Sequence, residues 1–312
     1  MKIAVLADIH SNHIALEACL KEISQEKVDA VALLGDYVSD CPYPQKTMEL
    51  VRQIQENWAC WCICGNREEY LIQYRKEGAT GWKDGSRYGS LLYTYENLTE
   101  RDLDWFESLP VSAHIRPRAA APFLLCHGAI HQTKPDMLYR KRPGEILAGI
   151  KEPLLLYGHT HIPYEYSDKG KLLVNVGSVG VSVDGQTRAR YAILEYRDGR
   201  WHPEIRGAVY DTGRVLREFE ESGLLERGGM WSRAICYTLL TGRNYSYKSV
   251  SLVGQWVRKE GGSVEDEELW KRAARQLGCF DWPCVVPPKE EKEFEIMIQQ
   301  GRRAHHSSDK KK

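Results

Sequence analysis

The sequence has no excess of charge of either sign, since 43 Lys and Arg residues balance 43 Asp and Glu residues. A formal net charge of zero gives the chain no long-range field that would attract a polyanion, so a nucleic-acid partner is not expected. The sequence also lacks any run approaching the roughly 18 apolar residues that a membrane-spanning helix needs. We therefore expect no contact with a membrane.

We also expect no secretory signal peptide, because the apolar start of the chain is interrupted at Asp8 before it reaches the length of a signal-peptide core. Nine cysteines make an odd number, and three of them, Cys60, Cys62 and Cys64, alternate along a predicted strand. Side chains with this spacing share one face of the strand, and a single strand cannot wrap them tetrahedrally around zinc. We interpret them as buried thiols and expect a cytoplasmic protein.

Residues 1–77 alternate between the patterns of strands and helices. Apolar runs predict strands over 2–7, 29–34 and 59–64. A helical pattern follows each run: the first covers 14–23, the second passes through Met48 and Ile54, and the third follows Asn66. This βαβαβα order predicts a parallel sheet with right-handed crossovers.

Two helices are predicted over 87–109, with a turn at 97–100 between them, and Thr99 is expected to cap the second helix. Strands dominate the part of the chain that follows. Turns at 168–170 and 198–200 predict hairpins, so we expect the added strands to be largely antiparallel. Together the two halves predict a two-sheet α/β sandwich. The added strands are expected over 111–115, 123–126, 154–157, 164–166, 172–176, 191–196 and 201–205.

The strand pattern stops near Asp211. We therefore divide the chain into a domain over 1–210, a helical module over 211–300 and a disordered polar tail over 301–312. The module could be a lid, a homo-oligomer contact or a docking site for a protein partner. A Lys-rich tail with His305 and His306 could touch nucleic acid, but a solvated tail is favoured. Helices are expected near 211–222, 230–241, 247–259 and 265–276.

Five of the predicted strands end in residue types that bind metal ions. Loops at strand ends are where protein scaffolds place chemistry. A single His or Asp beside a strand is more often an ordinary polar residue, but seven such residues after five strands are hard to obtain by chance. These seven candidate ligands are Asp8, His10, Asp36, Asn66, His127, His159 and His161.

This set is large enough for two divalent ions. Its mixture of nitrogen and oxygen donors argues against an all-oxygen calcium or magnesium site and favours manganese, iron or zinc. Two-metal sites of this kind typically hydrolyse phosphoesters, because the ions activate a bridging water and neutralise charge on the phosphoryl group. The sequence therefore predicts a phosphoester hydrolase.

The order of the motifs resembles that of the calcineurin-like metallophosphoesterases. The matching motifs are Asp-x-His, Gly-Asp, Gly-Asn, His-Gly and Gly-His-x-His, and they occur in this order over about residues 1–206. The stretches ADIHSNHIALEA, LLGDYVSDCPYP, GHTHIP and NVGSVG resemble bacterial phosphodiesterases and diadenosine-polyphosphatase-like proteins. The resemblance implies a four-layer α/β/β/α fold, to which the sequence adds an all-helical C-terminal module.

The resemblance also implies how the ligands divide between the two ions. Asp36 is the implied bridge, and a hydroxide held between the ions attacks phosphorus in line, without a covalent enzyme intermediate. Manganese is the expected ion, with iron or zinc as alternatives. One ion would be held by Asp8, His10, Asp36 and His161, and the other by Asp36, Asn66, His127 and His159.

Arg67 departs from the family pattern, because many relatives have a His after the Gly-Asn pair that protonates the leaving group. An arginine does not release its proton in proteins. Arg67 could instead hold a phosphate oxygen, or it could form a salt bridge with Glu68 or Glu69. His131 or His13 could then be the acid, although each is as readily explained as a surface residue.

We accordingly expect a dinuclear phosphodiesterase or phosphoanhydride hydrolase that acts on a phosphorylated small molecule, with a nucleotide-type substrate favoured. Asp36, Arg67 and His131 are its expected catalytic residues. Without a general acid, poor alkyl leaving groups such as phosphoserine should suffer most. A serine/threonine-type phosphoprotein phosphatase and a non-catalytic scaffold that keeps the fold are the alternatives.

Overall fold

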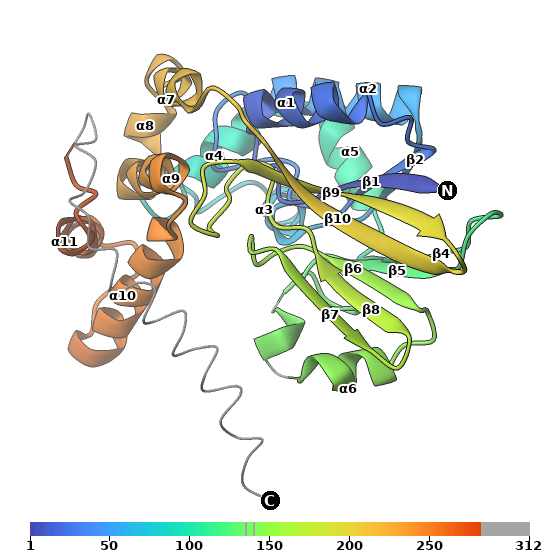
Figure 1. The fold of residues 1–312 in the computed structure, drawn as a ribbon. Helices are drawn as coiled ribbons and strands as arrows, with labels where there is room; N and C mark the ends of the chain where they lie inside the picture. The colour runs from blue at the N-terminus through green and yellow to red at the C-terminus, as the bar shows by residue number, and fades with distance from the viewer. Residues whose placement is uncertain (135, 140, 282–312) are drawn as a thin grey trace, which may run out of the picture. The chain divides into compact units, whose positions relative to one another are not determined.

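The computed structural model describes residues 1–134, 136–139 and 141–281 (Figure 1). Residues Met1–Phe280 form one compact unit. The tail predicted over 301–312 and the end of the predicted helical module lie outside the described residues. The division at residue 210 therefore stays a prediction.

The first sheet has five strands in the order β10-β9-β1-β2-β3. Strands β1 (Lys2–Leu6), β2 (Ala30–Leu33) and β3 (Ala59–Cys62) are parallel, as the βαβαβα pattern predicts. Strands β9 (Ala189–Arg197) and β10 (Arg200–Ala208) form an antiparallel hairpin that adds to β1. The helices that link or follow the parallel strands are α1 (His13–Ile23), α2 (Pro44–Asn57), α3 (Asn66–Lys76), α4 (Gly89–Glu96) and α5 (Glu100–Ser108).

The second sheet also has five strands, in the order β4-β5-β6-β8-β7. Strands β5 (Phe123–Cys126), β6 (Leu154–Tyr157) and β8 (Lys171–Asn175) are parallel, and β4 (Ser112–Ile115) and β7 (Tyr164–Asp168) are antiparallel at the two edges. The expectation of largely antiparallel strands is therefore wrong for the centre of this sheet. Helix α6 (Pro143–Ala148), which the sequence analysis did not predict, supplies part of the crossover between β5 and β6.

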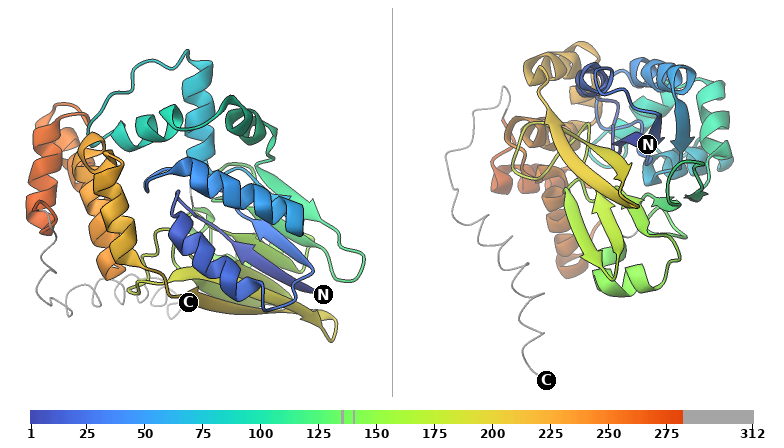
Figure 2. Two further views of the ribbon diagram at one scale, coloured as in Figure 1. Left: turned by 90° about the horizontal axis from the view of Figure 1, so that it is seen from above. Right: turned by 45° about the vertical axis from the view of Figure 1, so that its right-hand side comes forward.

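Alternating side chains of β1 divide the core into layers. Ile3 and Val5 pack between the two sheets, whereas Ala4 and Leu6 pack under the helices. A third cluster covers the far face of the second sheet with side chains of α6. The order helix, sheet, sheet, helix is visible in Figures 1 and 2 and confirms the predicted four-layer fold.

Helices that follow β10 form a further layer beside α4 (Figure 2). They have a small core of their own around Val253, Trp270 and Ala273. They are also tied to the rest of the unit, since Glu267 accepts hydrogen bonds from Ser86 N at 2.6 Å and Ser86 Oγ at 2.8 Å. These helices are α7 (Thr212–Glu221), α8 (Leu224–Arg227), α9 (Gly229–Thr241), α10 (Tyr245–Glu260) and α11 (Glu267–Leu277).

Two local predictions can be compared with the structure directly. Thr99 caps α5 by accepting from Asp102 N at 3.3 Å. The interpretation of three cysteines as buried thiols is confirmed for Cys64, whereas Cys60 and Cys62 are half-buried thiols on one face of β3, with their sulfur atoms 3.5 Å apart. Among the described helices, none is both long and apolar enough to cross a bilayer.

Candidate metal centre

The candidate ligands occupy loops at the carboxyl ends of β1, β2, β3, β5 and β6. Five of them, Asp8, His10, Asp36, His159 and His161, have left-handed backbone conformations, with φ between 51° and 70°. Non-glycine residues rarely adopt this conformation, and it costs free energy that the surrounding structure must offset. The strained backbone turns these side chains from both sheets toward one point.

Two of these loops approach each other so closely that glycine is required. A Cβ atom on Gly65 would lie 2.2 Å from Asp36 N, well inside van der Waals contact. Glu68 then joins the loops, because its buried carboxylate accepts from Gly65 N at 2.9 Å, Asp36 N at 2.8 Å and Tyr37 N at 2.9 Å. This contact sets the separation of Asp36 and Asn66.

Asp8, His10 and His161 form the first group of ligand atoms. These atoms lie within 4.8 Å of one another. The Nε2 atoms of His10 and His161 are 3.0 Å apart, and His161 Nε2 is 3.4 Å from Asp8 Oδ1. Asp36 Oδ2 lies 3.6 Å from His10 Nε2, at the side that faces the second group.

Asp8, Asp36 and His127 form the second group, also within 4.8 Å. His127 Nε2 lies 3.4 Å from Asp36 Oδ2 and 3.9 Å from Asp8 Oδ1. Asn66 adds an amide oxygen 3.2 Å from the same nitrogen. All four side chains are buried.

The donor chemistry of both groups fits bound cations. His161 Nδ1 is 2.6 Å from Val181 O, and His127 Nδ1 is 2.7 Å from Leu34 O. Each carbonyl holds a proton on Nδ1, which leaves the lone pair of Nε2 directed at carboxylate, amide or imidazole acceptors. Facing lone pairs repel one another unless a cation lies between them, so these residues suit a metal.

The pKa values in the protein without metal reflect the same crowding of acceptors. Burial would lower the pKa of His127, but the Asp36 and Asp8 carboxylates raise it to about 10. Burial would raise the pKa of Asp36, but His127, His10 and Arg67 lower it. Burial and His127 lower the pKa of His159 to about 4, so its imidazole is neutral at pH 7 and able to bind a metal.

Asp40 is a site residue that the sequence analysis missed. Its carboxylate lies 3.1 Å from His10 Nδ1 and accepts from Arg67 Nη2 at 2.9 Å and from Trp231 Nε1 at 2.9 Å. Burial would raise its pKa, but Arg67, His10 and Trp231 lower it to about 2. The sequence signal for Asp40 was the presence of a second aspartate four residues after Asp36. Nothing in the sequence indicated that Trp231 of α9 would contact it.

Arg67 is the second residue of α3, and its largely buried side chain pairs with Asp40, not with Glu68 or Glu69 as the salt-bridge alternative proposes. Its backbone N donates to Asp36 Oδ1 at 2.8 Å, which leaves Asp36 Oδ2 facing His10 and His127. The buried Nε atom of Arg67 has no hydrogen-bond partner among the described residues. This donor remains available to a ligand.

The remaining histidines are placed differently. The ring of His159 lies 5.2 Å from that of His127, between centroids, but among the described residues His159 belongs to neither group of ligand atoms. His131 is exposed in the segment after β5 and makes no hydrogen bond or ion pair within the described ranges. His13 is buried in α1, where its Nε2 is 2.8 Å from Glu218 of α7, so it is already engaged.

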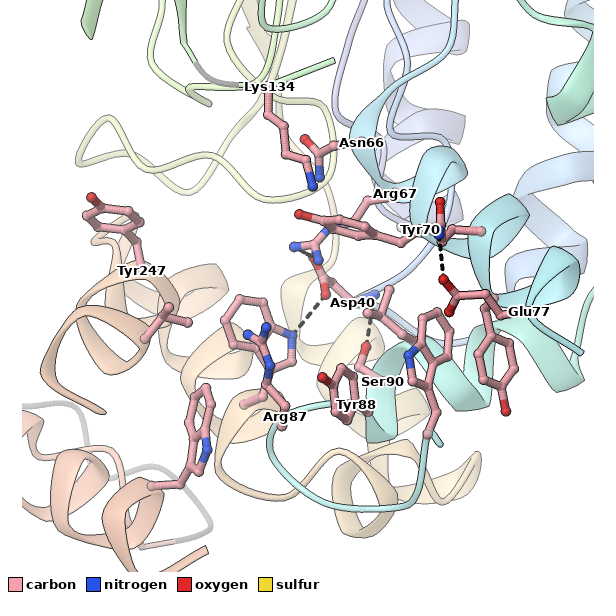
Figure 3. Close-up of a pocket in the computed structure, with 17 residues that line it drawn as sticks. Asp40, Asn66, Arg67, Tyr70, Glu77, Arg87, Tyr88, Ser90, Lys134 and Tyr247 are labelled. Carbon is pink, nitrogen blue, oxygen red and sulfur yellow. Dashed lines mark hydrogen bonds and ion pairs between the residues drawn. The ribbon is translucent and has the colours of Figure 1, made fainter. Parts of the chain in front are cut away.

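A cavity of about 510 Å³ opens beside the metal centre (Figure 3). Asp40, Asn66 and Arg67 line it at the metal end, and side chains of α9, α10 and α11 line the opposite wall. A small molecule held in this cavity would reach the ligand groups. The helices that follow β10 are therefore part of the site.

Comparison of the sequence with known protein families agrees with this fold and with these groups of ligand atoms. The profile of the calcineurin-like phosphoesterase superfamily domain matches residues 1–199. The chain belongs to this superfamily. Its members are metal-dependent phosphoric ester hydrolases, and the candidate ligands lie within the matched residues.

Relatives of this phosphoesterase cover most of its length. A curated relative, the uncharacterized protein MJ0912 of Methanocaldococcus jannaschii, is 26% identical over 245 residues, which is 72% of this chain and 94% of the relative. A metallophosphoesterase from Sphaerobacter thermophilus has a similar structure, with a TM-score of 0.61 and 25% identity over 78% of this chain and all of its own. The hypothetical protein PH1004 from Pyrococcus horikoshii shares the fold, with a TM-score of 0.59, 19% identity and coverage of 73% and 98%.

Proposed function

We propose that this phosphoesterase is a dinuclear enzyme that hydrolyses a phosphodiester or phosphoanhydride bond in a nucleotide-type substrate. The observation that carries the proposal is the adjacency of two ligand groups around Asp8 and Asp36, with acceptor atoms facing each other in both. Manganese is the expected ion, because imidazole and carboxylate donors are mixed.

When bound, the two ions would supply an activated water and neutralise charge on the phosphoryl group. The residues of the chain orient the reaction. Asp36 and Asp8 would hold the ions, and Asp40, which contacts both His10 and Arg67, would orient these two side chains. Arg67 Nε is placed to donate to a phosphoryl oxygen and to stabilise negative charge there.

Asp36 is the proposed bridging ligand, although Asp8, and not Asp36, is the residue that the two groups of ligand atoms share. Asp36 Oδ2 lies 3.6 Å from His10 Nε2 of the first group and 3.4 Å from His127 Nε2 of the second. Asp36 has one oxygen held by Arg67 N, while its other oxygen faces His10 and His127. Asp36→Asn is expected to weaken both ions together and to lower turnover at least about a hundredfold, since even outer-shell partners are worth about 10- to 100-fold. Metal content and hydrolysis of an aryl phosphodiester measure this.

Asp8→Asn is the companion variant to Asp36→Asn. Asp8 would be the bridging ligand if Asp8→Asn loses both ions and Asp36→Asn loses only one. Near wild-type metal content and turnover in Asp36→Asn would contradict the assignment altogether.

Arg67→Ala is expected to lower turnover roughly 10²- to 10³-fold without removing metal, because it deletes a donor to the developing charge. Arg75→Ala is the matched control, since Arg75 lies on the same helix and pairs with the surface carboxylates of Glu100 and Asp104. Metal analysis of the purified variants separates the two possible roles of Arg67. Loss of metal in Arg67→Ala would show a structural role instead.

The leaving group decides between a nucleotide substrate and a phosphoprotein. Among the described residues that line the cavity, Asp40 is the one carboxylate at the metal end and it already pairs with Arg67, so the exposed His131 remains the proposed general acid. A phosphoanhydride or aryl ester needs less protonation than an alkyl ester. Activity on phosphopeptides, with none on dinucleoside polyphosphates or aryl diesters, would favour the phosphatase.

A further inference from the structure

The cavity beside the metal centre extends along one face of α3. It is lined by Asn66 at the start of the helix and then, at steps of three or four residues, by Arg67, Tyr70, Gln73 and Glu77. At a rise of about 1.5 Å per residue, the ten steps from Arg67 to Glu77 span roughly 15 Å. The cavity therefore reaches well beyond the space that one phosphate would occupy.

Aromatic side chains form much of its wall. Trp82 stacks against Tyr74 at 3.9 Å and lies parallel to Tyr88 at 5.9 Å, measured between ring centroids. Across the cavity, Trp231 and Trp270 meet edge to face at 6.4 Å. Tyr247 of α10 is 69% exposed, so its ring is available to a ligand.

Two exposed cations belong to the lining of the cavity. Arg87 and Lys134 are exposed, and among the residues described neither forms an ion pair with a carboxylate. Each lies over an aromatic ring instead, Lys134 Nζ at 4.1 Å from the Tyr70 centroid and Arg87 Cζ at 5.2 Å from the Tyr88 centroid. Figure 3 shows Lys134 beside Asn66 and Arg87 near Tyr88.

The composition of the cavity matches that of a particular ligand class. Aromatic faces stack with planar bases, and unpaired Lys and Arg side chains bind phosphate oxygens. The metal centre and Arg67 account for the phosphoryl group that reacts. A substrate with a single phosphate would therefore leave Arg87 and Lys134 without a phosphate oxygen to bind.

We propose that this cavity binds the non-reacting part of the substrate, and that this part is an aromatic base joined through at least one further phosphate. Arg87 and Lys134 hold the further phosphate, and Tyr247 and the Trp231 side of the wall contact the base. The proposal rests on the proposed phosphoesterase function and narrows it to nucleoside polyphosphate-type substrates. It also makes the helices after residue 211 determinants of specificity.

The test is calorimetric titration of the manganese-loaded full chain with adenosine 5′-(α,β-methylene)diphosphate, ribose 5-phosphate and inorganic phosphate. Stacking of one base is worth roughly 5- to 150-fold in affinity, so the adenosine analogue should bind at least about fivefold tighter than ribose 5-phosphate. The double variant Arg87→Ala/Lys134→Ala should weaken the analogue about tenfold or more and leave inorganic phosphate unchanged.

Matched controls separate the cavity from general charge effects. Arg116→Ala/Lys151→Ala removes two exposed cations that do not line the cavity, and it should leave every dissociation constant unchanged. Tyr247→Ala should weaken the analogue several-fold, whereas Tyr247→Phe, which keeps the ring, should not.

Two outcomes distinguish failure of this proposal from failure of the proposed function. If the analogue binds no tighter than inorganic phosphate while the enzyme hydrolyses an aryl phosphodiester with manganese, the cavity proposal is overturned and the hydrolase stands. If the analogue binds as expected but no ester is hydrolysed, the cavity proposal is supported and the proposed reaction is wrong.

Discussion

At the residue scale, Asp40 connects the metal centre to the wall of the cavity. Its carboxylate contacts His10, which is a candidate metal ligand, as well as Arg67 and a tryptophan 191 positions later in the chain. A carboxylate next to the non-ligating nitrogen of a histidine sets its tautomer and its orientation. Asp40 is therefore a positioning residue for both His10 and Arg67.

Asp40→Asn is expected to lower metal affinity at the His10 site about 10- to 100-fold, the usual cost of losing an outer-shell partner. It should also lower turnover beyond what saturating manganese restores, because Arg67 loses its charged partner. Metal titration followed by steady-state kinetics at saturating manganese measures both effects. Asp104→Asn, at an exposed position on α5, is the control, and an Asp40 variant that behaves like it would rule out the positioning role.

At the scale of elements, the site depends on how closely the loops after β2 and β3 approach. Glycines at positions 35 and 65 allow the contact, and the Glu68 carboxylate then satisfies three backbone N–H groups that have no strand partner there. Asp36 and Asn66 are thereby held on the same side as His127. Side-chain identity and loop packing are both needed to form the second ligand group.

Gly65→Ala is expected to destabilise the protein by about 1–3 kcal/mol, the usual range for overpacking, because its Cβ would meet Asp36 N. It should also reduce metal content, since the two loops must separate. Urea denaturation and metal analysis test this. Gly144→Ala is the matched control, because its Cβ would meet nothing closer than 3.5 Å. Equal stability of the two variants would show that the loops tolerate the separation.

At the scale of the whole molecule, the metal centre joins the two sheets. Asp8 and Asp36 follow strands of the first sheet, whereas His127, His159 and His161 follow strands of the second. Ions bound between them would link the two layers of the sandwich. Stability and metal binding should therefore be coupled.

Manganese is expected to increase the free energy of unfolding by about 2.7 kcal/mol per site at a free concentration of 100 Kd, and this increase should raise the thermal midpoint of unfolding. Removal of metal by a chelator should reverse the rise. Magnesium is the comparison ion, and it should shift the midpoint less because it favours oxygen ligands over imidazole. An equal shift with magnesium, or none with manganese, would contradict a mixed nitrogen and oxygen centre.

The sequence by itself determined the layers and the chemistry of the site. The spacing of apolar residues, with a period of 2 in strands and 3.6 in helices, is a local property of the sequence. It therefore predicted most strands and helices and placed the polar residues at strand ends. The two ligand groups then follow from parallel strands, whose carboxyl ends lie together within each of the two sheets. The parallel centre of the second sheet was not predicted, because hairpin turns show how neighbouring strands pair but not how distant ones do.

Only the tertiary structure decided which partner each charged group has. Arg67 pairs with Asp40 instead of its sequence neighbours, His13 with Glu218, and Trp231 with Asp40. These pairs join residues that lie 27, 205 and 191 positions apart. Their formation depends on how helices and loops pack in space, and a local pattern carries no record of that packing. The cavity has the same origin, since its walls come from α3 and from helices that follow the last strand.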